Sequence, residues 1–455
     1  MMWNFKQYGD ATAVIETSGE HYTYSFLEEE GARLAAEVGE RKLVFCLCTN
    51  VVGSLLGYTA FLNHGIVPLL LNAEIDNDLL TSLIKSYKPD YLWKPSKNAE
   101  LGYELVKTLY NNKFPLYEEL ALLLTTSGST GSPKFVRQSY KNIQANTESI
   151  VEYLKLDSAE RPITTLPMSY TYGLSIINSH LWVGASLILT DKGLMQKEFW
   201  DAFNTYGATS FGGVPYTYEM LDKLHLYRMD LPTLGTMTQA GGKLSPELHK
   251  KFAEYAEKTN RHFVVMYGQT EATARMSYLP PEKSLEKYGS MGIAIPGGKF
   301  KLIDVNGNVI TEPEVVGELV YKGNNVTLGY AECGADLAKG DELGGVLFTG
   351  DMAKRDAEDY YYIVGRKKRF LKIFGNRVNL DEAEQLVKTH FDCECACAGV
   401  DDKMSVFITN IDIIQDTRQF ISKKTGLHPS AFEVKVIATI PKNEAGKTLY
   451  TALEG

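Results

Sequence analysis

The sequence contains few cysteines and no long apolar segment. Six cysteines occur among 455 residues, too few for a framework of disulfides in a chain of this length. No segment reaches the roughly 18 uninterrupted apolar residues typical of a transmembrane helix, because polar residues and a proline interrupt the most apolar stretch, 58–71. The first residues, MMWNFKQYGD, lack the basic start and apolar core of a secretory signal. These absences predict a cytoplasmic protein with no membrane span.

Basic residues are fewer than acidic ones. The chain has 47 Lys and Arg against 56 Asp and Glu, which gives a net charge of −9. No dense basic run offsets this balance, so the molecule as a whole repels nucleic acids and anionic membranes. We therefore expect no nucleic-acid partner, while a local site for an anion is compatible with the composition.

The segment CECACAGV places Cys393, Cys395 and Cys397 at alternate positions. In a strand, this spacing brings the three thiols to one face. Structural zinc sites usually combine a pair of closely spaced ligands with a second pair, and the sequence nearby supplies no second pair. We therefore interpret these residues as buried, reduced thiols rather than as metal ligands.

Apolar runs of strand length alternate with amphipathic helical stretches over most of the chain, which predicts α/β layers. Ser25 and Glu28 form an S-x-x-E capping box, which predicts the start of a helix that continues to Val38. The elements expected next are a strand over Leu43–Cys48, a helix over Gly53–Asn63 and a strand over Ile66–Leu71.

Beyond residue 299 the chain changes to short β segments around an Asn306-Gly307 turn. The basic cluster 366–369 follows and marks the border of a small carboxy-terminal domain, Arg369–Gly455. Its helix begins near Asn379, and its strands are expected at 394–400, 404–408 and 433–439. The predicted fold class is α/β, with a large multi-sheet N-terminal domain of layered α/β subdomains and a small α+β C-terminal lid domain.

The most informative segment is LLLTTSGSTGSPK, residues 122–134. A hydrophobic strand leads into a loop of glycines and hydroxyl residues, and a helical pattern follows. Glycines let the backbone approach a ligand, hydroxyls donate hydrogen bonds and Lys134 adds positive charge, so the loop suits phosphate oxygens. The loop differs from a Walker loop, which ends in Gly-Lys-Ser or Gly-Lys-Thr. The Gly-Lys-Thr triplet of this chain lies elsewhere, at 446–448, and has Pro441 where the Walker pattern requires glycine. The candidate phosphate-binding residues are Thr126, Ser127, Gly128, Ser129, Thr130 and Gly131.

The order T-S-G-S-T-G-x-P-K resembles a motif of the adenylate-forming superfamily, which contains acyl-CoA and aryl-CoA synthetases, adenylation domains of peptide synthetases and firefly luciferase. Further segments resemble motifs of that family, in the same order, along nearly the whole chain. They are LPMSYTYGLS at 166–175, QAGG at 239–242, MYGQTEAT at 266–273, FTGD at 348–351, GRKKRFLK at 365–372 and IPKNEAGK at 440–447. The resemblance implies an enzyme that binds ATP and Mg²⁺ and activates a carboxylic acid.

The resemblance also implies where the nucleotide binds. Tyr267 and the strand-end glycines lie near adenine, and Arg366 contacts ribose or phosphate. Asp351 holds the ribose hydroxyls, a role that suits a carboxylate because it accepts two hydrogen bonds at once. Together with the loop 126–131, the implied nucleotide-binding residues are Lys134, Ala240, Gly241, Gly242, Tyr267, Gly268, Asp351 and Arg366.

Four catalytic residues are implied in the same way. Thr270 contacts the α-phosphate, and Glu271 holds Mg²⁺. Lys447 neutralises the negative charge that builds up on the α-phosphate and the incoming carboxylate oxygen during adenylation. Lys372 enters the site for the second half-reaction, after rotation about a hinge at Lys368.

The candidate acyl pocket is apolar and partly aromatic, which suits an aryl or a medium-chain acyl carboxylate. Adenylation domains of peptide synthetases place an aspartate near the aromatic motif to bind an α-ammonium group, and segment 167–174 contains none. Because an unpaired buried ammonium is costly, α-amino acids are disfavoured. Tyr170 also departs from the histidine of many CoA synthetases. The expected lining is Tyr170, Tyr172, Gly212, Gly213, Val214 and Thr273, with Phe211, Ala240 and Ala274.

We therefore predict an ATP-dependent acid–thiol ligase with a large domain, 1–367, and a mobile small domain, 369–455. The acid first forms acyl-AMP, and the thiol of CoA then accepts the acyl group. A phosphopantetheinyl carrier protein or an amine is the alternative acceptor. A non-catalytic nucleotide-binding protein is the alternative of another class; it predicts loss of Lys447, Glu271 or Asp351, and all three are present.

Overall fold

The structure is a computed structural model that describes residues 2–99, 101–125, 134–373, 376–400, 402–442 and 448–453. For residues 368, 370, 372, 376, 377 and 451 it describes the backbone alone. The chain forms two compact units. The first consists of Met1–Lys299 and Tyr321–Leu347, and the second consists of Phe300–Val320 and Phe348–Gly455. Several sheets in a large and a small part confirm the predicted α/β fold class. The units divide the chain at positions other than residue 368, and the proposed hinge there stays a prediction.

The first unit contains a seven-stranded sheet, and β7, β4, β3 and β5 run parallel in it. The order across the sheet is β18 (Tyr330–Ala331), β8 (Phe135–Ser139), β7 (Leu120–Thr125), β4 (Val67–Asn72), β3 (Leu43–Cys48), β5 (Tyr91–Pro95) and β6 (Tyr103–Lys107). The strands expected at 43–48 and 66–71 are thus confirmed, the second displaced by one residue.

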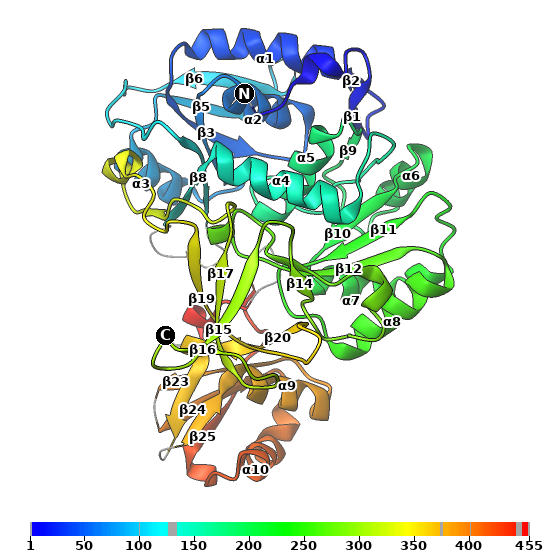
Figure 1. Cartoon of the computed structure of the whole chain (residues 1–455), viewed down its shortest axis with the longest axis vertical. Helices are drawn as coiled ribbons and strands as arrows, with labels where there is room; N and C mark the ends of the chain where they lie inside the picture. Colours follow the sequence, from blue (N-terminus) through cyan, green and yellow to red (C-terminus); the bar gives the residue numbers. More distant parts are fainter. Residues whose placement is uncertain are drawn as a thin grey trace. The chain divides into compact units, whose positions relative to one another are not determined.

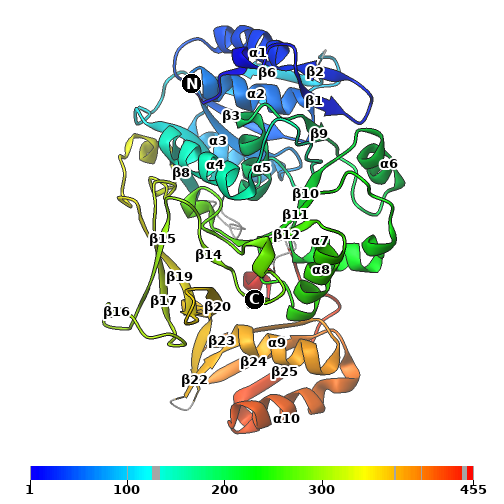
Figure 2. The same cartoon turned by 45° about the vertical axis from the view of Figure 1, so that its right-hand side comes forward.

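Helices cover both faces of this sheet, so its central strands are buried on both sides. In β3, alternate residues enter different cores: Cys46 packs with one apolar cluster and Phe45 with another. Figures 1 and 2 show α4 and α5 side by side over one face. That face packs against α1 (Tyr24–Val38), α2 (Val52–Asn63), α4 (Tyr140–Leu154) and α5 (Thr171–Trp182), and the other packs against α3 (Asn77–Tyr87).

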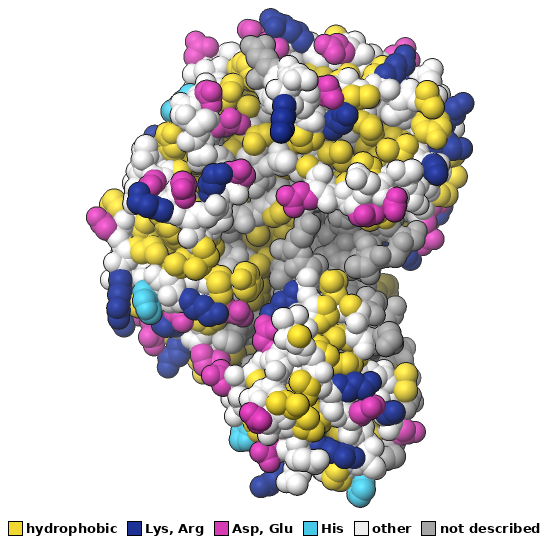
Figure 3. Space-filling model, turned by 180° about the vertical axis from the view of Figure 1, so that it is seen from behind, with side chains coloured by type: hydrophobic (Ala, Val, Ile, Leu, Met, Phe, Trp, Pro, Cys, Tyr) yellow, Lys and Arg dark blue, Asp and Glu magenta, His cyan; other side chains and the backbone are white. Residues whose placement is uncertain are grey.

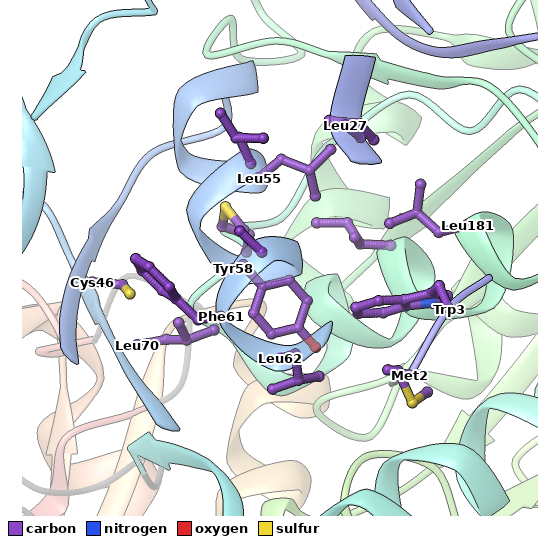
Figure 4. Packing of buried hydrophobic residues seen from close by; sticks show 14 of the residues in the cluster. Met2, Trp3, Leu27, Cys46, Leu55, Tyr58, Phe61, Leu62, Leu70 and Leu181 are labelled. Atoms are coloured by element: carbon purple, nitrogen blue, oxygen red, sulfur yellow. The ribbon is translucent and has the colours of Figure 1, made fainter. Parts of the chain in front are cut away.

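The core between α2, α5 and the amino-terminal segment contains aromatic rings among aliphatic side chains (Figure 4). Trp3 meets Tyr58 edge to face with the ring centroids 5.7 Å apart. The hydroxyl of Tyr58 donates to the side-chain oxygen of Asn178 at 2.9 Å. Asn63, the last residue of α2, accepts from the backbone N–H groups of Met2 and Trp3, both at 2.9 Å. Met2 and Trp3 are therefore part of the core.

A second sheet of the first unit carries three parallel strands, β10, β11 and β12. Its order is β10 (Ser210–Gly213), β11 (Thr236–Gln239), β12 (His262–Tyr267), β13 (Ser277–Tyr278) and β14 (Ile293–Ala294), and its helices are α6 (Lys197–Thr205), α7 (Pro215–Lys223) and α8 (Pro246–Lys258). A third, small sheet has the order β2 (His21–Thr23), β1 (Thr12–Glu16) and β9 (Leu187–Leu189).

The second unit combines a five-stranded sheet with a smaller α+β part. The sheet, which includes a few residues of the first unit, has the order β16 (Val309–Ile310), β15 (Lys299–Ile303), β17 (Gly317–Lys322), β19 (Val346–Arg355) and β20 (Tyr361–Arg366). The remainder contains β21 (Phe370–Ile373), β22 (Asn376–Asn379), α9 (Leu380–Phe391), β23 (Cys395–Val400), β24 (Lys403–Ile408), α10 (Ile414–Thr425) and β25 (Phe432–Val436).

Short 3-10 turns connect many of these elements. They are η1 (Phe5–Gln7), η2 (Leu226–Arg228), η3 (Thr270–Ala272), η4 (Pro281–Lys283), η5 (Gly334–Ala338), η6 (Lys367–Arg369), η7 (Ile411–Ile413), η8 (Pro429–Ala431) and η9 (Tyr450–Ala452). Among the described residues, no helix combines the length and the apolar character needed to cross a membrane. On the face shown in Figure 3, acidic and basic side chains are interspersed over the described surface of each unit.

Two local predictions need correction. The cap of α1 is Thr23, whose hydroxyl accepts from the N–H of Phe26, so the helix begins before the predicted cap Ser25. Cys395 and Cys397 are buried free thiols on β23, as interpreted, but Cys393 precedes the strand and is half-buried. In contrast, Asn379 caps α9 as expected, accepting from the N–H groups of residues 381 and 382.

The close packing of α2 predicts that one added methyl group lowers the stability of the fold. A Cβ atom on Gly57 would lie 2.2 Å from Nε1 of Trp93, whereas one on Gly31 of α1 would lie 3.4 Å from Cβ of Ala60, an ordinary contact. Gly57→Ala should lower the free energy of unfolding by about 1–3 kcal/mol through overpacking. Gly31→Ala, the matched control, should be neutral or stabilise by up to about 1 kcal/mol. Urea unfolding measures both, and equal stability of the two variants would contradict this packing.

Two buried histidines predict sensitivity to acid. Burial lowers the pKa of His180 and of His249 to about 4, whereas histidine in an unfolded chain titrates near pH 6.5. The unfolded state therefore binds more protons between these values, so the stability linked to them is complete above about pH 6.5 and is lost as the pH falls toward about 4. His180→Leu should reduce the pH slope of the unfolding free energy in this window by up to about 1.4 kcal/mol per pH unit.

Unfolding of the His180 variant between pH 4 and 7 provides the measurement. His262 is exposed, and His262→Gln is the control that should leave the slope of the wild type unchanged. A slope that is the same in all three proteins would show that His180 does not contribute.

Candidate functional site

Three parallel strands of the first unit end at one edge of a sheet. Strands β10, β11 and β12 lie side by side in Figure 2. Open α/β sheets bind ligands at the carboxyl ends of their parallel strands. The predicted segments 212–214, 240–242 and 267–273 lie at these ends or directly after them. The fold therefore brings three of the sequence-predicted groups together.

Glycine is required at this edge by close contacts. A Cβ atom on Gly241 would lie 2.7 Å from the hydroxyl of Tyr170, and one on Gly268 would lie 1.7 Å from the carbonyl oxygen of Ala274. Gly241 also has a φ of +84°, which favours glycine. The glycines of QAGG and YGQTE are thus explained by packing of the protein itself, in addition to any ligand.

Tyr170 and Tyr172 form an aromatic wall beside these glycines. Tyr172 is buried in α5 and shares a hydrogen bond of 2.7 Å with Thr238, while burial raises the pKa of Tyr170 to about 12. A Cβ atom on Gly212 would lie 2.9 Å from the hydroxyl of Tyr172. Both tyrosines share an apolar cluster with Val214. The function of this wall as an acyl pocket stays a prediction.

Two other residues of the predicted pocket contact neighbouring residues of the protein. The hydroxyl of Thr273 donates to the carbonyl of Asn325 at 2.7 Å, and the Thr273 carbonyl accepts from the side chain of Gln138 at 3.4 Å. A Cβ atom on Gly213 would lie 2.7 Å from Thr217 of α7. Both residues shape the edge of the sheet through these internal contacts.

Glu271, the predicted metal ligand, is held by a tyrosine from a distant part of the chain. Its Oε1 accepts a hydrogen bond of 2.7 Å from the hydroxyl of Tyr330. Burial, and then the neighbouring carboxylate, raise the pKa of Tyr330, so the phenol stays protonated and donates. The N–H and hydroxyl of Thr327 both donate to the backbone carbonyl of Glu271 at 3.0 Å. The side chain and the backbone of Glu271 are therefore both fixed; Thr270 precedes it in η3 and is buried.

Lys134, the last residue of the predicted phosphate-binding segment, lies beside the same tyrosine. Its Nζ is 5.6 Å from the ring centre of Tyr330 and 2.9 Å from a carboxylate oxygen of Glu332. Both side chains of the ion pair are more than half exposed, and exposed pairs contribute little stability. The ammonium is consequently available to an anionic ligand.

A fully buried arginine fixes the segment that carries Tyr330 and Glu332. Arg137 of β8 has 0% exposure, and it pairs with Glu342 at 2.5 Å. Its other hydrogen bonds go to the carbonyl oxygens of residues 328, 330, 339 and 340. The guanidinium thus holds β18 beside β8 and keeps Tyr330 within reach of Glu271.

The sequence motifs missed both Arg137 and Tyr330. The segment FVRQS carries a charge inside an otherwise strand-like run, and this signal could have marked Arg137 as buried and paired. Tyr330 lies 59 residues after Glu271, outside every motif, and no spacing in the sequence connects the two.

The second unit places Asp351 and Arg366 opposite each other on β19 and β20. Nε of Arg366 lies 3.6 Å from Oδ1 of Asp351, and the aspartate is 6% exposed. The side chain of Arg366 is 64% exposed, so the guanidinium can contact a ligand while remaining near the carboxylate. Lys372 lies on β21, opposite Arg377 of β22.

Several predicted residues lie outside the described part of the molecule. The loop residues Thr126–Gly131 and the catalytic candidate Lys447 belong to this group. The backbone of Lys368 and of Lys372 is described, and their side chains are not. The proposed functions of these residues therefore stay predictions.

The described residues of the first unit fit a nucleotide with Mg²⁺. Magnesium prefers carboxylate oxygens, and the Glu271 carboxylate retains lone pairs beyond the one that accepts from Tyr330. Lys134 supplies a cation for phosphate oxygens.

Comparison with known proteins defines the class of this protein. The model of the AMP-binding enzyme family matches residues 2–331, most of the chain, and the chain therefore belongs to this family. This result confirms the resemblance that the sequence motifs indicated.

The similarity to individual proteins is lower. The peroxisomal OPC-8:0-CoA ligase 1 of Arabidopsis thaliana is 28% identical over 347 residues, which are 73% of this chain and 63% of the relative. An oxalate–CoA ligase of Arabidopsis thaliana is 28% identical over 342 residues, 72% of this chain and 65% of the relative. The chain thus spans less than two thirds of the length of these relatives.

A solved structure shares the fold over the whole chain. O-succinylbenzoate coenzyme A synthetase from Bacillus subtilis, solved in complex with ATP and magnesium ion, is 21% identical. Its TM-score is 0.82, and the alignment covers 99% of both chains. This likeness supports the same fold class and the same order of elements.

The hydrogen bond from Tyr330 predicts a measurable effect on metal use. Tyr330→Phe removes the donor to Glu271 while keeping the ring, so the Mg²⁺ concentration for half-maximal nucleotide turnover should rise about 10-fold. Tyr288 is an exposed tyrosine, and Tyr288→Phe is the matched control. A Mg²⁺ titration of ATP turnover distinguishes them, and an unchanged midpoint in the Tyr330 variant would contradict this role.

Proposed function

We propose that this protein is an AMP-forming carboxylic acid–CoA ligase. The carboxylate of the acid attacks the α-phosphorus of ATP, the bond to pyrophosphate breaks, and acyl-AMP forms. The thiol of CoA then attacks the acyl carbon, AMP leaves, and the thioester forms. ATP, a carboxylic acid and CoA are thus the substrates, and Mg²⁺ is the metal.

One observation carries the proposal: Glu271 is fixed by Tyr330 at the carboxyl edge of β12, with Lys134 beside the same ring. A hard oxygen ligand and a cation in one site match the needs of a metal-bound polyphosphate. Membership of the AMP-binding enzyme family and the names of the relatives, which are CoA ligases, support the same interpretation.

The motif resemblance assigns the residues that bind the nucleotide. Tyr267 and the glycines of 240–242 bind adenine, and Thr270 contacts the α-phosphate. Asp351 accepts hydrogen bonds from the ribose hydroxyls, a role that suits a carboxylate because it accepts two hydrogen bonds at once. The loop 126–131 adds donors for the outer phosphates.

Two lysines of the second unit serve the two half-reactions in turn. Lys447 stabilises the charge that develops at the α-phosphate during adenylation, and Lys372 faces the site during thioester formation. Rotation about Lys368 exchanges them, with residues 1–367 and 369–455 as the two domains. These assignments derive from the motif resemblance.

CoA is the favoured acceptor because the relatives are CoA ligases. A phosphopantetheinyl carrier protein has the same reactive thiol and remains the alternative, as does an amine. A non-catalytic nucleotide-binding function is disfavoured, since Lys447, Glu271 and Asp351 are all retained.

The aromatic wall of Tyr170 and Tyr172 supports an aryl or a medium-chain acyl group beside the reacting carboxylate. The names of the relatives refer to chemically different acids, so the comparisons do not identify the acid that this protein uses. A cytoplasmic location is part of the proposal, although one of these relatives is named peroxisomal.

The direct test incubates the full chain with ATP, Mg²⁺, CoA and a panel of aliphatic and aryl carboxylic acids. We expect pyrophosphate release with at least one acid and the matching acyl-CoA by mass spectrometry. ATP binding without pyrophosphate release for any acid would favour the non-catalytic alternative. Pyrophosphate release without acyl-CoA, but with acyl carrier protein or amide, would favour the other acceptors.

Replacement of Lys447 should separate the half-reactions. Lys447→Ala should slow acyl-AMP formation by at least about 100-fold, as for loss of one transition-state donor. Thioester formation from supplied acyl-AMP should change little, by less than about 5-fold. Lys442 pairs with Glu394, and Lys442→Ala is the control from the same segment. Equal loss of both half-reactions in the Lys447 variant would contradict the exchange of lysines.

A further inference from the structure

Arg275 is a buried arginine at the candidate acyl pocket. It is 2% exposed. Its Nε donates to the hydroxyl of Ser175 at 3.1 Å, and Nη1 donates to the hydroxyl of Tyr153 at 3.0 Å. Nη1 also lies 3.3 Å from the sulfur of Met266. The guanidinium is 5.3 Å from the ring centre of Tyr172. Every one of these partners is electrically neutral.

The other buried arginines have carboxylate partners. Arg137 pairs with Glu342, and Arg369 pairs with Asp381 and Glu384. Among the residues that the structure describes, no carboxylate lies within ion-pair distance of Arg275. The undescribed loop 126–133 contains no acidic residue. Within the described part of the chain, Arg275 therefore differs from Arg137 and Arg369 in having no carboxylate partner.

An uncompensated cation inside a protein is unfavourable. A guanidinium keeps its charge at any physiological pH, and a buried charge is retained at low cost only when it is paired. Contact with the face of Tyr172 provides some compensation, typically less than an ion pair does. An anionic ligand would supply the missing charge.

The backbone holds Arg275 in this position. Its carbonyl accepts from the side-chain amides of Asn146 at 2.8 Å and of Asn325 at 3.1 Å. The residue follows Glu271 by four positions, so it is tied to the same edge of the sheet. The guanidinium touches Tyr172 and Met266, which belong to the apolar cluster of the predicted pocket. A cation is thus fixed over the ring of Tyr172.

We propose that Arg275 binds a second anionic group of the acid substrate. The substrate is then a dianionic acid. One carboxylate is adenylated, and a second carboxylate pairs with the guanidinium of Arg275. An apolar or aryl segment between the two lies against Tyr170 and Tyr172. This inference rests on the proposed function and specifies its substrate class.

The test compares acids that differ in one distal group. A series of α,ω-dicarboxylic acids and benzenedicarboxylic acids is assayed beside the monomethyl ester of each and the monocarboxylic acid of equal length. We expect a kcat/KM for acyl-CoA formation about 10- to 100-fold higher for the best dianion than for its monoester, the range typical of charge-assisted hydrogen bonds. The difference should arise mainly in KM.

Variants connect this preference to the residue. Arg275→Leu should bring the dianion and its monoester to within about 3-fold of each other, because the charge that distinguishes them is gone. Arg275→Lys should restore part of the preference. Tyr153→Phe is the matched control, since it removes a neutral partner of the same guanidinium and keeps the cation, and its preference should remain that of the wild type. Thermal unfolding with and without ATP verifies that each variant is folded.

The outcomes separate this inference from the proposed function. If no acid supports pyrophosphate release, the proposed function fails. If monoesters and monocarboxylic acids react as well as the dianions in the wild type, the ligase activity stands and the function of Arg275 is overturned. The wild-type comparison alone decides this point, even where an Arg275 variant does not fold.

Discussion

The structure around the candidate site depends on the buried guanidinium of Arg137. Its hydrogen bonds reach the carbonyl oxygens on both sides of β18 and the carboxylate of Glu342. They add to the backbone hydrogen bonds of Arg137 with residues 328 and 329 and to the bond from the Tyr87 hydroxyl to the Ala331 carbonyl, and together these hold the two-residue strand β18 beside β8. Tyr330 and Glu332, which contact Glu271 and Lys134, lie on or next to this strand. The buried ion pair of Arg137 and Glu342 therefore helps to position the polar site through the backbone of the segment that carries Tyr330.

A second constraint is the close approach of backbone and rings at the carboxyl ends of β10, β11 and β12. Gly212, Gly241 and Gly268 each leave space that a Cβ atom would fill. Tyr170 lies against Gly241 and Tyr172 against Gly212, and the guanidinium of Arg275 lies over the ring of Tyr172. The same packing that excludes larger residues thus places a cation next to an apolar wall. The proposed preference for a dianionic acid rests on this combination of a cation and an apolar wall.

The sequence predicted the fold class, the central strands and the motif segments that meet at the sheet edge. These elements are local: Leu43–Cys48 is a continuous apolar run, and Asn379 caps a helix that begins at the next residue. Contacts between distant segments could not be predicted. The pairing of Glu271 with Tyr330 and the lack of a carboxylate partner for Arg275 among the described residues both depend on which side chains the tertiary structure brings together. Position alone was also insufficient for the cap of α1, where Thr23 and Ser25 are both capping residues by type.

The central claim is that the carboxylate of an acid attacks the α-phosphate of ATP. The most direct measurement uses an accepted acid whose carboxylate oxygens carry a heavy isotope, in a complete reaction with CoA. Attack at the α-phosphorus leaves one labelled oxygen on the phosphate after the thiol displaces AMP. The account predicts AMP with a single heavy oxygen and unlabelled pyrophosphate by mass spectrometry. Unlabelled AMP, or label in pyrophosphate or in inorganic phosphate, would contradict it.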